Sequence, residues 1–146
     1  MIRSLALALL SLGALLLSAL PVRADDQDVI DYRTHVMKTL GEQMDAIGMI
    51  LENKAPPDNF ATHLKVLAVT ATQAKKAFEP KVPGGNAKPE VWSNWADFSK
   101  RLDDLVAGSA DLAAAAPHES VAAIGAKLGP SLKCKGCHEN YRKPLK

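Results

Sequence analysis

The segment QDVIDYRTHVMKTLGEQMDAIGMILEN, residues 27–53, carries its apolar side chains at helical spacing. These side chains are Val29, Val36, Met37, Leu40, Met44, Ile47 and Leu51. Steps of three, four and seven residues place them on one face, which predicts an amphipathic helix from about Gln27 to Asn53. Aspartates at 25, 26, 28 and 31 suit its N-terminus, where negative charge is favourable. The following Ala55-Pro56-Pro57 is expected to end the helix.

Three further segments show the same spacing. The second helix is expected to begin with Asp58 as its N-cap, and the Pro- and Gly-rich residues 79–88 to form the longest loop. A third helix follows Pro89, which a first helical turn tolerates, and Pro117 is expected to open the fourth. Their apolar positions are Phe60, Leu64, Leu67, Ala71, Ala74, Phe78, Trp92, Trp95, Phe98, Leu102, Leu105, Leu112, Val121, Ile124, Leu128 and Leu132.

The four segments predict an all-α fold. Short connections favour antiparallel neighbours, so we expect an antiparallel up-down four-helix bundle in a single domain, residues 25–146. Pro130 removes one helical hydrogen bond, and with Gly129 beside it we expect a kink or a break in the last helix.

Immediately after that break stands Cys134-Lys135-Gly136-Cys137-His138. The spacing C-x-x-C-H is that of a c-type haem attachment site. Two thiols separated by two residues, in one helical turn, can each form a thioether with a haem vinyl group, and His138 can then supply an axial imidazole nitrogen to the iron. The motif predicts one covalently bound haem c, near the C-terminus of the last helix.

Two other interpretations of the cysteines, a redox disulfide and a zinc site, have less support from the sequence. A redox C-x-x-C usually opens a helix after a strand and needs no following His. A zinc site needs about four ligands, and the remaining histidines, His35, His63 and His118, show no paired metal spacing. A four-helix protein with a disulfide and no haem therefore stays the minor alternative.

The N-terminus agrees with export. Met1-Ile2-Arg3 precedes an apolar run from Leu5 to Leu20, and Val22-Arg23-Ala24 offers small residues to a signal peptidase. Residues 1–24 are thus predicted to be a signal peptide, removed to leave a periplasmic protein; an uncleaved anchor is the alternative. No second long apolar run follows, so the mature form is expected to be free of the membrane.

Charge excludes one class of function. The chain has 18 Lys and Arg against 16 Asp and Glu, and two of the basic residues, Arg3 and Arg23, lie in the predicted leader. The mature chain is therefore near neutral, and nothing indicates binding of nucleic acid. Basic residues nevertheless gather around the haem motif: Lys133, Lys135, Arg142, Lys143 and Lys146. They fit either a solvated helix end or a rim that attracts an acidic redox partner.

The second axial ligand is expected from the first helix. Arg33, Met37, Gly41 and Met44 lie roughly on one stripe of it. The thioether of Met37 can ligate haem iron, Gly41 would leave room for the flat ring, and Arg33 could pair with a propionate. The alternative is ordinary, because a Met on an apolar stripe usually fills a core.

These features resemble a known family. An exported four-helix chain with C-x-x-C-H at its C-terminus is similar to the class II cytochromes c, the cytochrome c-prime family. The similar segments are Tyr32-Arg33 with Met37, GGNAKPEVW at 84–92 and CKGCHENYR at 134–142. The resemblance implies that Cys134 and Cys137 hold the haem and that His138 is the proximal ligand. It also implies haem or propionate contacts for Arg33, Thr34 and Asn86, and a basic residue, Arg142, beside the proximal pocket.

The resemblance leaves two functions open. In one branch of the family a first-helix Met ligates the iron, which is then low-spin; the segments around Met37 and Trp92 look more like this branch. The expected function is then electron transfer with periplasmic redox proteins, through His138 and Met37 ligation. In the other branch the iron is high-spin and five-coordinate and binds nitric oxide or carbon monoxide. Neither is an enzyme, and the family allows a homodimer.

Overall fold

The fold is known from a computed structural model that describes residues 24–145. Within that range the chain is helical and has no strand. All of the predicted leader except Ala24 lies outside the described residues, so its removal stays a prediction. No helix within residues 24–145 is long and apolar enough to cross a membrane.

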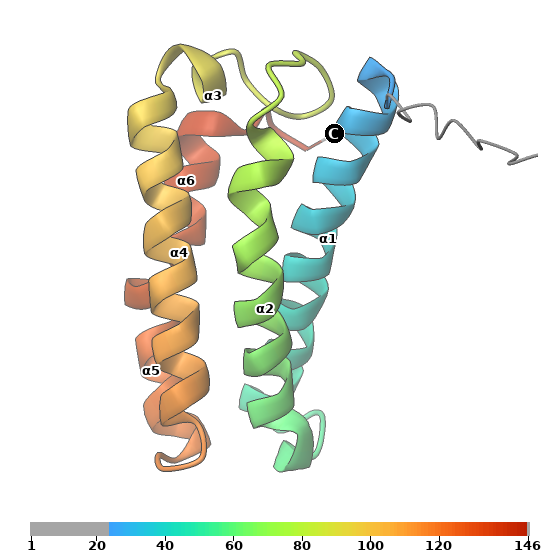
Figure 1. The fold of residues 1–146 in the computed structure, drawn as a ribbon. Helices are drawn as coiled ribbons and strands as arrows, with labels where there is room; N and C mark the ends of the chain where they lie inside the picture. Colours follow the sequence, from blue (N-terminus) through green and yellow to red (C-terminus); the bar gives the residue numbers. More distant parts are fainter. Residues whose placement is uncertain (1–23, 146) are drawn as a thin grey trace, which may run out of the picture.

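In the described part of the chain, four long helices run alternately up and down (Figure 1). They are α1 (Asp26–Leu51), α2 (Phe60–Phe78), α4 (Trp95–Ala115) and α5 (Val121–Leu132). Three short elements complete the described chain: a 3₁₀ turn, η1 (Pro57–Asn59), the helix α3 (Glu90–Ser93) and the helix α6 (Cys134–Tyr141). The antiparallel up-down four-helix bundle is confirmed, with its third and fourth helices each divided in two.

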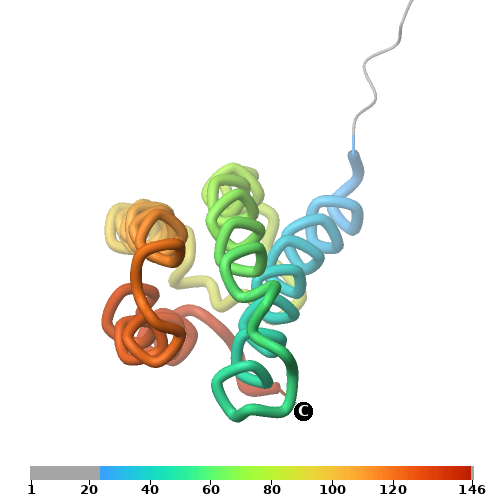
Figure 2. The backbone as a smooth tube through the Cα atoms, turned by 90° about the horizontal axis from the view of Figure 1, so that it is seen from below, coloured from blue at the N-terminus to red at the C-terminus, as the bar shows by residue number. Residues whose placement is uncertain are grey.

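Helix α1 diverges from the rest of the bundle. It packs closely along α2 and contacts α5 at few positions, while α6 contacts α3 and α4, each also at few positions. In Figure 2 the N-terminal end of α1 lies farthest from α5. The elements that carry Met37 and His138 therefore do not pack extensively on each other.

Helix starts follow local capping. Asp25 caps α1, since its carboxylate accepts from the Asp28 amide and the Asp28 side chain accepts from the Asp25 amide in return. The prediction that Asp58 caps the second helix is wrong, because Asp58 lies inside η1 and α2 begins at Phe60. The prediction that Pro117 opens the fourth helix is also wrong. Ser120 caps α5 instead, with its hydroxyl accepting from the Ala123 amide.

The apolar faces form two core clusters. The lower cluster consists of Leu40, Ile47, Ile50, Phe60, Leu64, Leu67, Ala71, Leu112, Ile124, Leu128 and Leu132. The upper cluster consists of Val36, Ala74, Ala77, Phe78, Val91, Phe98, Leu102 and Tyr141. Met37 packs against both. Because Tyr141 belongs to α6, the upper cluster ties the cysteine-bearing helix to the bundle.

Gly108 permits a close approach of α4 to the end of α5. A Cβ built there would overlap the backbone carbonyl of Ser131, which cannot move aside as a flexible side chain can. Gly108→Ala is therefore expected to lower the free energy of unfolding by about 1–3 kcal/mol, measured by urea titration. The matched control is Gly48→Ala in α1, where a Cβ meets nothing within 4 Å. This control should gain up to ~1 kcal/mol. Equal effects at the two positions would contradict the packing argument.

Candidate haem site

The cysteine-bearing segment is a separate helix. The last helix is interrupted as predicted, but at Lys133 and not at Gly129-Pro130, since α5 continues through Pro130 to Leu132. Lys133 adopts φ 50° and ψ 29°, the left-handed region. That conformation costs a non-glycine residue roughly 1–2 kcal/mol, but it lets the chain end α5 and begin α6 at once.

Helix α6 presents the three residues of the motif within little more than one turn. It begins at Cys134, which is exposed, and places Cys137 and His138 half-buried after it. Burial raises the pKa of the half-buried Cys137 thiol. Burial also lowers the pKa of His138, and the positive charge of Arg142 lowers it further. A neutral imidazole has a lone pair free for a metal, so this environment suits an axial ligand.

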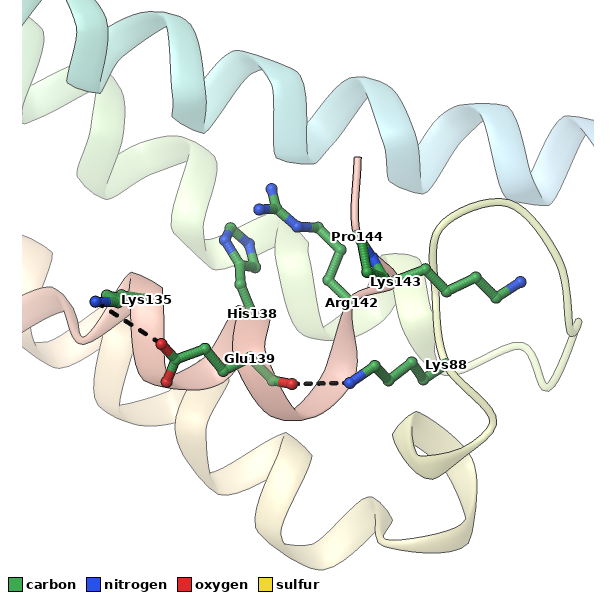
Figure 3. A pocket seen from close by; sticks show the side chains of 7 residues that line it. All are labelled: Lys88, Lys135, His138, Glu139, Arg142, Lys143 and Pro144. Carbon is green, nitrogen blue, oxygen red and sulfur yellow. Dashed lines mark hydrogen bonds and ion pairs between the residues drawn. The ribbon is translucent and has the colours of Figure 1, made fainter. Parts of the chain in front are cut away.

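A cavity of about 510 Å³ adjoins His138. Its lining residues are Lys88, Lys135, His138, Glu139, Arg142, Lys143 and Pro144 (Figure 3). The side chains of His138 and Arg142 project from α6 in the direction of α1. Two free thiols and an imidazole are the groups that a covalent haem requires, and there is space beside His138. The residues present therefore fit the group.

On α1, Met37 and Gly41 differ in their exposure to solvent. Met37 is half-buried between the two core clusters. Gly41, one turn later, is exposed, and a Cβ there would meet nothing within 4 Å. Open space beside Gly41 is compatible with a flat ring next to α1. Ligation of the iron by Met37 stays a prediction.

Arg33 is buried and bonded to the loop of residues 79–88, a set of partners that the sequence did not predict. It is 3% exposed, and its guanidinium donates to the carbonyl oxygens of Val82 at 2.6 Å and Gly84 at 2.8 Å. The guanidinium carbon also lies 5.0 Å from the ring centre of Trp92 and 5.6 Å from that of Phe78. Two of its donors are therefore engaged by a loop, and contact with a propionate would have to use the others.

Three site residues were implied only by the resemblance. Thr34 lies in α1, Asn86 in the loop before α3, and Arg142 directly after α6. The Thr34 hydroxyl donates to the Ile30 carbonyl at 2.7 Å, which occupies its only donor. Asn86 is exposed, and its carbonyl accepts from the Lys143 amide at 2.8 Å. Arg142 is exposed and lines the cavity beside His138. Contacts of these residues with the haem stay predictions.

A polar network behind α6 was not foreseen. Tyr141 is 5% exposed. Its hydroxyl donates to the Asp97 carboxylate and accepts from the side-chain amide of Asn94 at 3.0 Å. Arg101 Nε donates to the same carboxylate at 2.6 Å. The network joins α4 to α6 three residues after His138. Its signal in the sequence was weak: a Tyr in a polar C-terminal segment, with its partners about 40 residues earlier.

Hydrogen bonds from Tyr141 and then from Arg101 lower the pKa of Asp97. A carboxyl whose folded pKa is lowered stabilises the fold above its ordinary pKa, about 3.9, and this contribution is lost as the pH falls through the folded value. Asp97→Asn should therefore cost stability at about pH 6 and much less near pH 3. Urea midpoints at both pH values measure this, with the exposed Asp111→Asn as the control. A pH-independent loss would contradict the assignment.

Comparison with known proteins decides the family. The family model described as Cytochrome C' matches residues 28–142. This chain is a member of the cytochrome c' family. It is 33% identical over 141 residues to cytochrome c' of Rhodospirillum rubrum, covering 90% of this chain and 93% of the relative. The predicted family is thus confirmed, and with it a single covalently attached c-type haem.

Solved structures of cytochrome c' share the bundle. The nitric oxide complex of a variant from Alcaligenes xylosoxidans is 28% identical, with a TM-score of 0.73, covering 84% of this chain and 99% of that one. A variant from the same organism with bound carbon monoxide is also 28% identical, with a TM-score of 0.72, covering 83% and 98%. The relatives therefore favour the gas-binding alternative over our first expectation of His138 and Met37 ligation.

Proposed function

We propose that this cytochrome c' is a periplasmic monohaem protein that binds nitric oxide or carbon monoxide at five-coordinate iron. The observation that carries the proposal is that similar solved structures hold those two gases. This chain matches 99% and 98% of the length of these two structures. The haem, when bound, supplies an iron that holds a gas molecule and exchanges one electron. We propose no chemical conversion of a substrate.

The chain's own residues would divide the work between two helices. Cys134 and Cys137 would hold the group on α6, and His138 would bind from the same side. Met37 would cover the opposite side, and its contacts with both core clusters would hold its half-buried side chain there. A packed apolar side chain excludes water and limits which ligands fit, without itself needing to bind.

A second candidate is electron transfer with Met37 as the sixth ligand. It is favoured by the position of Met37 one turn before Gly41, which borders open space on α1. The thioether is flexible enough to reach a nearby ring. Both candidates use the same haem and differ only in what occupies the sixth position.

Absorption spectra of the haem-loaded protein near neutral pH separate the two candidates. Gas binding predicts high-spin, five-coordinate spectra in both oxidation states and a ferrous form that takes up carbon monoxide. A low-spin ferric spectrum with a sulfur-to-iron charge-transfer band would refute it in favour of electron transfer. A haem stain after denaturing electrophoresis should be positive in either case, whereas a disulfide protein would stay colourless.

We also propose that electrons are exchanged with an acidic partner at the basic side of the cavity. Lys88, Lys135, Arg142 and Lys143 border it, and Glu139 is the single acid among its described lining residues. Lys135 is 91% exposed, and its ion pair with Glu139 is long, at 3.9 Å. A pair this exposed neutralises little charge, so the surface stays positive.

Lys135→Glu is accordingly expected to slow oxidation of the ferrous protein by hexacyanoferrate(III), an anionic probe, by roughly 2- to 10-fold at low salt. The effect should fade as the ionic strength rises. Lys65→Glu, the same change at an exposed site on α2, is the control. Equal slowing by both variants would indicate overall charge and would refute a local docking surface.

A further inference from the structure

We propose that Arg33 is a positioning residue that sets the distance between Met37 on α1 and His138 on α6. It would act through the loop of residues 79–88, which we call the strap. The proposal rests on the proposed haem site between these two helices. It assigns Arg33 a role different from the propionate contact that the sequence suggested.

The strap is fastened to α1 by Arg33. The guanidinium is buried, and within residues 24–145 no carboxylate forms an ion pair with it. Its hydrogen-bonding partners are two strap carbonyls, those of Val82 and Gly84. Trp92, which follows the strap, stacks on the guanidinium and donates its indole N–H to the Phe78 carbonyl at 3.0 Å. The guanidinium therefore holds the middle of the strap by hydrogen bonds and contacts the rings of Phe78 and Trp92, which flank the strap.

Two glycines let the strap lie against α1. Gly84 and Gly85 have φ values of 145° and 54°. A Cβ on Gly84 would lie 2.5 Å from Cδ1 of Ile30, and one on Gly85 would lie 3.0 Å from Cγ2 of the same residue. A side chain at either position would be strained by the positive φ and would crowd Ile30 on α1. The close contact between the strap and α1 therefore depends on glycine at positions 84 and 85.

The other side of the strap is bound to α6 and the residues after it. The Lys88 amide donates to the Tyr141 carbonyl at 2.9 Å, and the Lys143 amide to the Asn86 carbonyl at 2.8 Å. Ala87 and Arg142 form an antiparallel bridge. The Lys88 ammonium adds a bond of 2.8 Å to the Glu139 carbonyl, which Figure 3 shows beside His138.

The strap thus connects two helices that barely pack on each other: it is bonded to the Arg33 side chain on α1 and, through backbone groups, to α6 and the residues after it. Arg33 lies one turn before Met37, and the bridge at Arg142 lies one turn after His138. Since the strap is held at both sides, its release would let α1 move relative to α6 at the level of the haem. The position of Met37 over the ring would change with it.

Arg33→Gln in the haem-loaded protein tests the proposal. Amide hydrogen exchange at Lys88 and Lys143 should accelerate about tenfold or more relative to the core of α2. The rate of carbon monoxide binding to the ferrous haem should change severalfold in the same variant. Arg33→Lys should restore part of both effects, because it keeps the charge but has a single donor group. Lys81→Gln, which removes an exposed charge from the strap itself, should change neither.

Gly85→Ala provides a second route that leaves Arg33 intact and should shift both readouts in the same direction. If Arg33→Gln accelerates exchange equally throughout the molecule, or frees the strap without changing the haem spectrum or ligand rate, the proposal is refuted. Failure of the proposed gas binding looks different. The unchanged protein would then be six-coordinate, and strap release should raise its high-spin fraction.

Discussion

Met37→Ala is expected to accelerate carbon monoxide binding to the ferrous haem by about 10- to 100-fold, which corresponds to a barrier lower by ~1.4–2.7 kcal/mol. Met37 is half-buried and packs against both core clusters, so under the proposed function its side chain would be held over the space that a ligand needs. Truncation to Cβ opens that space. Stopped-flow mixing of the ferrous protein with carbon monoxide measures the rate.

The spectrum of the same variant adds a second readout. If Met37 is only a cover, the unmutated iron is already high-spin and the variant changes rate alone. If Met37 ligates, the variant converts the iron from low to high spin. Met44→Ala is the control, because Met44 packs against the lower cluster alone. It should cost stability near the lower end of ~2–5 kcal/mol and leave the ligand rate unchanged. An unaltered rate in Met37→Ala would contradict both functions proposed for this residue.

Much of the bundle could be predicted because its determinants are local. Apolar spacing located four helical segments, and the Pro- and Gly-rich residues 79–88 located the long loop. The divisions within the third and fourth helices could not be predicted in the same way. Asn94 leaves helical geometry, with φ −124° and ψ 49°, while its amide bonds the Tyr141 hydroxyl 47 residues away. Lys133 is left-handed although Lys has no preference for that region.

The candidate site shows the same limit. The C-x-x-C-H spacing identified its own chemistry, since cysteine and histidine carry it wherever the motif stands. Arg33 was assigned from its stripe on α1, and the stripe was right in that the residue faces inward. Its partners, however, are carbonyls of the strap about 50 residues later, and a helical stripe contains no information about them. A backbone acceptor leaves no trace in side-chain sequence.

Phe98→Ala is expected to lower the free energy of unfolding by about 3–5 kcal/mol. Phe98 is 4% exposed and lies at the centre of an aromatic group in the upper cluster. Its ring centre is 5.1 Å from that of Phe78, 5.1 Å from that of Tyr141 and 5.8 Å from that of Trp95. Two of these pairs are edge-to-face, which adds to the value of the burial.

The loss should not be confined to stability, because Tyr141 belongs to the helix that carries His138. Without Phe98, α6 keeps its polar bonds to α4 but loses an apolar contact that fixes its orientation. We therefore expect the reduction potential of the loaded haem to shift as well, measured by redox titration. Val69→Ala, at a side chain 68% exposed on α2, should change neither quantity. A large loss of stability with an unchanged potential would show that the polar network around Tyr141 is enough to orient His138.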